Sequence, residues 1–97
     1  MLMDYFYTVL SKEKDKAVIK LADENHPIFK AHFPTNPIMP GFVNFEIIGD
    51  VFNVKITTIK RAKFLQTALP NQTLTYIKDK MKFKVYHDET EIANFSL

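Results

Sequence analysis

His32 and Glu46 are the two side chains of this sequence whose chemistry combines most readily in one reaction. His32 lies in a segment rich in proline, and Glu46 follows it in an apolar stretch. Because a proline restricts its own φ and the conformation of the residue before it, such a segment can hold an imidazole in a fixed place. An imidazole base and a carboxylic acid around one apolar slot suit removal of a proton next to a carbonyl group, with loss of a hydroxyl group one carbon further on.

Glu46 belongs to a segment, from Pro40 to about Phe52, that predicts a helix. Its apolar residues point in nearly every direction around the helix axis, which is typical of a buried helix. Asp50 lies one turn after Glu46 on the same face, and Gly49 beside it allows another element to pack closely. An ionised carboxylate in apolar surroundings costs free energy unless it is paired, so this helix favours a carboxyl group that can donate a proton near neutral pH.

The start of this helix offers a site for a carbonyl oxygen. Pro40 suits the first turn, where a missing N–H costs nothing. The backbone N–H groups of that turn can bind an oxygen on which negative charge develops. Gly41 has no side chain that would block the approach of a substrate.

The remaining segments predict a sheet around the helix. Met3–Val9 and Ala17–Leu21 form an expected hairpin across a charged turn, and a loop runs from Asp23 through the prolines. Further extended segments are predicted at Val54–Leu65, Leu74–Ile77 and Ile92–Leu97, and at Met81, Phe83 and Val85, whose alternation with lysines indicates one buried face. We expect one domain, residues 1–97, of the α+β class, in which an antiparallel sheet of about five or six strands wraps around one central buried helix.

Composition narrows the classes of function. The net charge is only +2, and basic residues interleave with acidic ones, which argues against a nucleic-acid partner. The absence of cysteine excludes a disulfide scaffold, a thiolate zinc site and a cysteine nucleophile. No apolar stretch approaches the ~18 residues that cross a bilayer, and the N-terminus does not resemble a signal peptide, so we expect a soluble cytoplasmic protein without a membrane partner. A chain of 97 residues without disulfides has a marginal core, which favours a partner subunit.

The other two histidines have simpler interpretations. His26 precedes Pro27 and is expected to be a turn residue, and His87, beside Asp88 at the end of a strand, is expected at the surface. The three histidines are not at metal-ligand spacing on any one element, so we expect no metal site.

The run His32-Phe33-Pro34-x-x-Pro37-Ile38-Met39-Pro40-Gly41, followed by x-x-x-x-Glu46, resembles the signature of the 3-hydroxyacyl-[acyl-carrier-protein] dehydratases. These are hot-dog fold enzymes of bacterial fatty acid synthesis. The resemblance extends from about His26 to Gln72 and includes the segment Ile59–Phe64, which is similar to the family's strand after the central helix.

The resemblance implies a role for each motif residue. His32 would remove the C2 proton of a (3R)-hydroxyacyl thioester, and Glu46 from the other subunit of a homodimer would handle the departing hydroxyl group. The N–H of Gly41 would polarise the thioester carbonyl, with Phe33 and Pro40 beside the substrate. The acyl chain would lie in an apolar tunnel at the dimer interface, the product would be the trans-2-enoyl thioester, and no cofactor would be needed.

The resemblance also implies a carrier-protein partner. Lys60, Arg61 and Lys63 could receive an acidic acyl carrier protein, or they could simply be the solvated face of a strand. Charge attraction of this kind raises the association rate more than the affinity.

The sequence departs from the family pattern in three places. Ala31 replaces a common glycine, Asp50 replaces a common glutamine, and the stretch from Phe52 to Ile59 is short. Asp50 could assist the site through Glu46, or it could simply face water near the end of the helix. Two other functions therefore stay open. One is a hot-dog acyl thioesterase in which Glu46 activates water, and the other is a non-catalytic subunit that binds acyl chains or carrier protein and pairs with a longer homologue.

Overall fold

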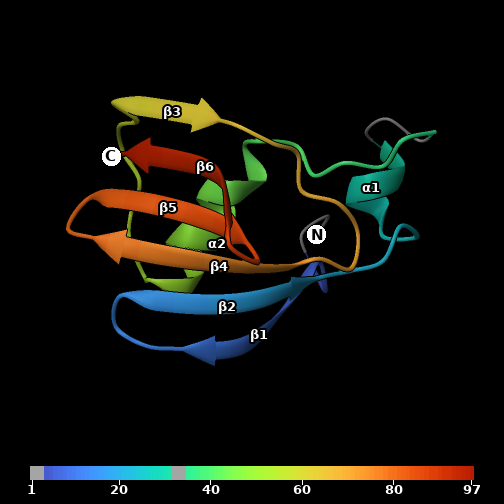
Figure 1. Cartoon of the computed structure of the whole chain (residues 1–97), viewed down its shortest axis with the longest axis horizontal. Helices are drawn as coiled ribbons and strands as arrows, with labels where there is room; N and C mark the ends of the chain where they lie inside the picture. The colour runs from blue at the N-terminus through green and yellow to red at the C-terminus, as the bar shows by residue number, and fades with distance from the viewer. Residues whose placement is uncertain (1–3, 32–34) are drawn as a thin grey trace.

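Six strands of the described residues form one sheet in which every neighbouring pair is antiparallel. The structure is a computed structural model that describes residues 4–31 and 35–97. The spatial order is β1-β2-β4-β5-β6-β3 (Figure 1). The bounds of the strands are β1 Tyr7–Lys12, β2 Lys16–Leu21, β3 Arg61–Phe64, β4 Thr73–Asp79, β5 Lys82–His87 and β6 Thr90–Ser96. Within these described ranges the helices are α1, Pro27–Ala31, and α2, Val43–Val51.

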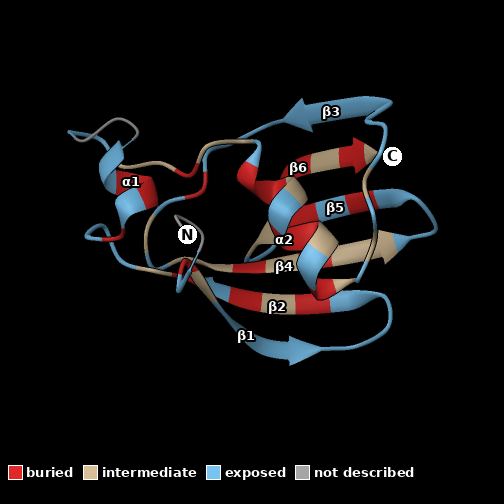
Figure 2. Ribbon diagram, turned by 180° about the vertical axis from the view of Figure 1, so that it is seen from behind, coloured by how far each residue is buried: buried red, intermediate tan, exposed pale blue. Residues whose placement is uncertain are grey.

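The helix α2 lies on one face of the sheet, and the core fills the space between them (Figure 2). Alternate side chains of the strands point toward the helix, as the two-residue period of a strand requires. Fully buried side chains of this layer are Ile19, Leu74, Tyr76, Phe83, Val85 and Phe95 from the sheet and Val43, Ile47, Ile48 and Val51 from the helix. The sheet around a central helix is therefore confirmed.

The expected hairpin is confirmed, since β1 pairs with β2. The strand β1, however, starts at Tyr7 and continues to Lys12, whereas Met3 lies outside the described residues. Met81 was expected in the core, and this was wrong, because its side chain is 44% exposed in the tight turn between β4 and β5. A residue in the turn of a hairpin lies beyond the end of the sheet, so its side chain stays uncovered even when the alternation of apolar residues includes it.

Only part of the predicted segment Val54–Leu65 is a strand. Pairing with β6 is limited to Arg61–Phe64. The residues before it cross from the end of α2 to the far edge of the sheet, and Val54 and Ile56 pack against the core there without a strand partner. The residues of this segment favour an extended conformation, but an extended segment becomes a strand only where another strand lies beside it.

The helix α1 was not predicted, since the segment after Asp23 was expected to be a loop. His26 accepts the N–H of Ile28 at its Nδ1, 3.1 Å away, and so acts as the cap of this short helix. Pro27 occupies the first helical position, which proline tolerates. Phe29 is buried and its ring lies 5.2 Å from that of Phe6.

The prediction of a helix apolar on all sides was wrong for α2. Its turns bury Val43, Asn44, Ile47, Ile48 and Val51, but Phe42, Glu46 and Asp50 are exposed along the opposite side. A single sheet covers only one side of a helix, so the other side stays open. The helix also begins later than predicted, at Val43, with Pro40 and Gly41 in the segment that leads into it.

Within the part of the chain that the structure describes, neither helix is long and apolar enough to cross a membrane.

Candidate active site

Glu46 and Asp50 lie side by side on the exposed side of α2, as their spacing predicted. Both line a shallow depression of about 420 Å³ whose other walls are Phe45, Gly49, Val54 and Ile56. A Cβ atom on Gly49 would lie 3.3 Å from the carbonyl oxygen of Val54, so the glycine does permit close packing. The two carboxyl groups are therefore accessible from one side of the chain.

Tyr7 joins this pair from the sheet. Its phenol O–H donates a hydrogen bond to a carboxylate oxygen of Asp50, so β1 is tied to α2 at this point. Burial, and secondly the hydrogen bond to Asp50, raise the pKa of Tyr7 above its ordinary value. The phenol therefore stays protonated and serves as a donor, which keeps Asp50 fixed one turn from Glu46.

Gly41 lies where β3 approaches the beginning of α2. A Cβ atom at this position would lie 2.7 Å from a ring carbon of Phe64, closer than real contacts allow. The carbonyl oxygen of Gly41 accepts the backbone N–H of Asn44 at 3.2 Å. Among residues 4–31 and 35–97, no backbone partner is found for the N–H of Gly41. That this N–H binds the oxygen of a substrate stays a prediction.

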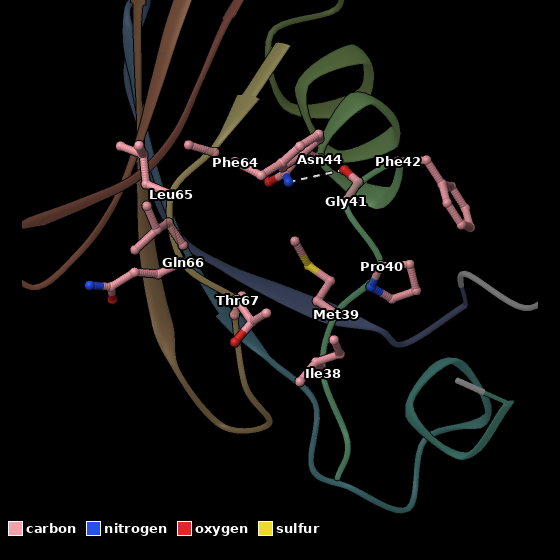
Figure 3. Close-up of a pocket in the computed structure, with 13 residues that line it drawn as sticks. Ile38, Met39, Pro40, Gly41, Phe42, Asn44, Phe64, Leu65, Gln66 and Thr67 are labelled. Atoms are coloured by element: carbon pink, nitrogen blue, oxygen red, sulfur yellow. Dashed lines mark hydrogen bonds between the residues drawn. The ribbon is translucent and has the colours of Figure 1, made fainter. Parts of the chain in front are cut away.

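A second, larger pocket adjoins Gly41 (Figure 3). Its volume is about 510 Å³, and it lies between the segment that leads into α2 and the segment that follows β3. The walls are mostly apolar, with a few polar groups, which is typical of a small-molecule site. The lining residues are Ile38, Met39, Pro40, Gly41, Phe42, Asn44, Phe64, Leu65, Gln66, Thr67, Ala68, Ile92 and Ala93.

Asn44 and Tyr76 are site residues that sequence reasoning missed. Asn44 lines the pocket and is hydrogen-bonded both to Gly41 and to the hydroxyl of Tyr76. An asparagine at a buried position of an apolar helix was the available signal, because a buried amide requires partners. Tyr7 could not be found this way, since its partner is distant in sequence.

His32 and Phe33 lie outside the described residues, so their predicted places stay predictions. The described chain ends at Ala31 on one side, where α1 ends. It resumes at Thr35, shortly before Ile38 and Pro40 at the pocket wall.

Lys60, Arg61 and Lys63 are exposed at and beside the edge strand β3. Arg61 pairs with Ser96 and Lys63 with Asn94, and these same two residues pair on their other side with Lys82 and Lys84. Residues that pair directly point to the same face of a sheet, so the four cations share one face, away from α2. We call Arg61, Lys63, Lys82 and Lys84 the basic surface, and Lys60 precedes it in the chain.

Within the described ranges, no three His, Cys, Asp or Glu side chains come together in a way that could hold a metal ion.

One antiparallel sheet with a central helix across one face is the hot-dog arrangement, as the sequence predicted. Two solved structures share it. A chain of the dehydratase heterocomplex ApeI:P from Xenorhabdus doucetiae matches with a TM-score of 0.69 at 20% identity, over 92% of this chain and 93% of that one. An uncharacterized protein from Erwinia carotovora subsp. atroseptica matches with a TM-score of 0.55 at 19% identity, over 92% and 91%.

The model of the ApeI-like family, described as ApeI dehydratase, matches residues 9–96. The chain therefore belongs to the ApeI-like dehydratases, and the resemblance seen in the sequence is confirmed.

Curated relatives have the name 3-hydroxyacyl-[acyl-carrier-protein] dehydratase FabZ. The protein of Thermoanaerobacter sp. (strain X514) is 42% identical over 53 residues, which are 54% of this chain and 37% of the relative. The protein of Desulforamulus reducens is 30% identical over 91 residues, covering 78% of this chain and 64% of the relative. The matches thus span less than two thirds of the length of these relatives.

Proposed function

We propose that the chain is a 3-hydroxyacyl-[acyl-carrier-protein] dehydratase, which converts a (3R)-hydroxyacyl thioester to the trans-2-enoyl thioester and water. The observation that carries the proposal is the arrangement of two groups around one short helix. Gly41, in the segment that leads into α2, lines an apolar pocket, and the exposed side of α2 carries Glu46. Family membership supplies the reaction class.

The proposed reaction needs one base, one acid and one polarising donor. The imidazole of His32 takes the proton from C2, and the electron pair of that C–H bond forms the new double bond between C2 and C3. The C3–O bond breaks, and the leaving hydroxyl group takes the carboxyl proton of Glu46 to become water. The N–H of Gly41, beside Phe33 and Pro40, stabilises the negative charge on the thioester oxygen in between. No cofactor takes part in this scheme.

We propose that the active form is a homodimer. Phe42, immediately before α2, and Phe64 on β3 are 57% and 52% exposed, and Ile59 and Leu65, which precede and follow β3 in the chain, are also exposed. Such apolar surface next to the free edge of β3 favours a second copy of the chain. That copy would cover Glu46, exclude water and bring His32 of one subunit to Glu46 of the other.

The partner that delivers the substrate is proposed to be an acyl carrier protein. The basic surface supports this, because acidic partners associate faster with a cationic face. The absence of cysteine fits the reducing cytoplasm, where we propose that the protein acts.

A second candidate is a non-catalytic subunit of a dehydratase made from two different chains. One specific observation favours it, namely that the chain shares its fold with a member of a dehydratase heterocomplex. The exposed side of α2 would then face a different partner.

The test is a dehydration assay with 3-hydroxyacyl groups on carrier protein, read by mass spectrometry. His32→Ala and Glu46→Gln should each lower turnover about 10²–10⁴-fold, the contribution of a general acid or base. His87→Ala and Glu89→Gln, the same changes at the hairpin between β5 and β6, are the controls. Undiminished turnover by either site variant would refute the mechanism. Release of free thiol from a crotonyl thioester would instead indicate a thioesterase, and activity only with a second, longer homologue would indicate the heteromeric subunit.

A further inference from the structure

A continuous hydrogen-bonded chain links the middle of the sheet to the glycine at the pocket. The hydroxyl group of Tyr76 on β4 donates to Oδ1 of Asn44 at 2.7 Å, and Nδ2 of Asn44 donates to the carbonyl oxygen of Gly41 at 3.1 Å (Figure 3 shows the second bond). Asn44 is 4% exposed and Tyr76 is fully buried. In this relay, the bond between Tyr76 and Asn44 is therefore buried in the core, and the bond between Asn44 and Gly41 is partly buried at the pocket wall.

The direction of each bond in the relay is determined by chemistry. Burial raises the pKa of Tyr76 well above its ordinary value, so its oxygen keeps the hydrogen and acts as a donor. Only the oxygen of the Asn44 amide can accept that hydrogen, which turns the NH₂ group toward Gly41. The reverse orientation of the amide would place its oxygen against the carbonyl oxygen of Gly41, with two acceptors together and no hydrogen between them.

The relay restrains a residue that would otherwise have unusual freedom. Glycine is needed at position 41 because the ring of Phe64 leaves no room for a Cβ atom, yet glycine rotates more freely than any other residue. The carbonyl oxygen of Gly41 accepts two hydrogen bonds, one from the backbone and one from the side chain of Asn44. The carbonyl of Gly41 belongs to the peptide that follows this residue, so the relay restrains ψ of Gly41. The peptide that contains the Gly41 N–H is held on its other side, because the carbonyl oxygen of Pro40 accepts the backbone N–H of Val43 at 3.1 Å. With both peptides held, the direction of the Gly41 N–H is restricted.

We propose that Asn44 and Tyr76 are positioning residues that aim the N–H of Gly41 at the carbonyl oxygen of the bound thioester. The inference rests on the proposed function. A purely structural role is a weaker explanation, because two apolar side chains of similar shape would fill this core position without the cost of desolvating an amide and a phenol. Catalysis by an oriented N–H depends steeply on its direction, which explains why that cost is retained.

Kinetics separate positioning from stability. Tyr76→Phe should lower kcat about 10–100-fold, because a misdirected N–H stabilises the oxyanion less well. The KM should change by no more than about twofold. The single variant leaves Asn44 without its donor, so it also loses stability. The double variant Asn44→Leu with Tyr76→Phe removes every unpaired polar atom, and its thermal midpoint should recover while kcat stays low. Full recovery of kcat together with stability would overturn the proposal. Tyr86→Phe, at a half-buried position of β5, is the matched control.

Nuclear magnetic resonance tests the inference even if no turnover is found. The chain has only two glycines, so ¹⁵N-glycine labelling gives two amide signals, and Gly49→Ala identifies which is which. A crotonyl thioester should shift the Gly41 signal of the wild-type chain, and this shift should be lost in the double variant while the Gly49 signal stays unchanged. An equal shift in both proteins would overturn the positioning role. A wild-type chain that binds the thioester at Gly41 without turnover would refute the proposed function but not the relay.

Discussion

The ring of Phe64 occupies the space that a side chain at position 41 would need. The nearest ring carbon lies 2.7 Å from where a Cβ atom of residue 41 would be, and a second ring carbon lies at 2.8 Å. Phe64 is held in turn by the ring of Phe95, whose centroid is 5.6 Å away. The edge strand β3 and the segment that leads into α2 therefore pack closely because residue 41 is a glycine. Its φ is not positive, so the contact rather than the backbone conformation excludes a side chain.

Gly41→Ala should therefore destabilise the fold and damage the site. Overpacking a position of this kind costs about 1–3 kcal/mol, and the displaced peptide should also lower dehydration activity. Combining it with Phe64→Leu, which removes ring atoms at the contact, should restore most of the lost stability. Urea unfolding measures both effects.

Gly49→Ala is the informative comparison for this prediction. Its Cβ atom would meet only the carbonyl oxygen of Val54, at 3.3 Å, and alanine favours a helix by about 1 kcal/mol over glycine. The change at Gly49 should therefore cost less than the change at Gly41. Equal costs, or no rescue by Phe64→Leu, would contradict the fitted contact.

The local part of the site could be predicted from the sequence. Glu46 and Asp50 share a face because their spacing follows the helical period. Gly41 was predicted as a site residue and does line a pocket, but the pocket itself was not predicted, because its other wall is the distant segment that follows β3. The exposure of Glu46 could not be predicted in the same way. An apolar sequence shows that a helix has apolar surface, but not whether a sheet of the same chain or another subunit covers it.

The hydrogen bonds of the site could not be predicted, because they join residues distant in sequence. Tyr7 on β1 reaches Asp50 near the end of α2, and Tyr76 on β4 reaches Asn44 near its beginning. These contacts exist only because the folded sheet places β1 and β4 beside the helix. Such pairings depend on strand register, and a shift by one residue would turn each phenol to the opposite face.

Tyr76 should make the protein less stable at alkaline pH. Burial raises its pKa above the ordinary value, so the folded chain holds this proton more tightly than the unfolded chain. The contribution is complete below pH ~10, where both states are protonated, and is lost as pH rises further because only the unfolded state ionises. The free energy of unfolding should fall by up to about 1.4 kcal/mol per pH unit for this group.

Urea titrations between pH 8 and pH 11 test the alkaline prediction. Tyr76→Phe should flatten the slope, although its stability at neutral pH is lower. Tyr5→Phe is the control, since this ring is almost fully exposed. Identical slopes for the Tyr76 variant and the wild-type chain would show that the phenol does not titrate between the two states.

Tyr7 and Asp50 should be energetically coupled. Their hydrogen bond is charge-assisted but partly accessible to solvent, so we expect a coupling free energy of about 0.5–1.5 kcal/mol. Tyr7→Phe, Asp50→Asn and the double variant form the cycle that measures it. Additive effects on the free energy of unfolding would mean that the bond does not link β1 to α2 in solution. Asp88→Asn, at an exposed turn, should change nothing in combination with Tyr7→Phe.

His26 should be required for the helix that precedes the His32 segment. Its Nδ1 accepts the N–H of Ile28, so Nε2 carries the hydrogen and donates to the carbonyl oxygen of Asp4 at 2.7 Å. His26→Ala removes the cap and should cost about 1 kcal/mol, whereas His26→Asn, a good capping residue, should cost less. Urea unfolding compares them with His87→Ala, a change at a half-exposed site. Equal losses for alanine and asparagine would assign the effect to packing against the ring of Phe6, 5.0 Å away.

The basic surface should govern the encounter with a carrier protein and not the chemistry. Lys84 is offset by Glu91, 3.9 Å away, whereas Arg61 and Lys63 lie exposed at the sheet edge. Arg61→Glu combined with Lys63→Glu should therefore raise KM for a carrier-bound substrate about 10-fold or more and leave turnover of a small thioester unchanged.

Salt provides the second readout of this prediction, because screening weakens attraction between exposed charges. The difference between the variant and the wild-type chain should shrink as ionic strength rises from about 0.05 to 0.5 M. Lys14→Glu is the control, since Lys14 lies in the turn between β1 and β2, at the opposite edge of the sheet from β3. Equal loss on carrier-bound and small substrates would mean that Arg61 and Lys63 act on the fold or the site, and the carrier would then have to dock elsewhere.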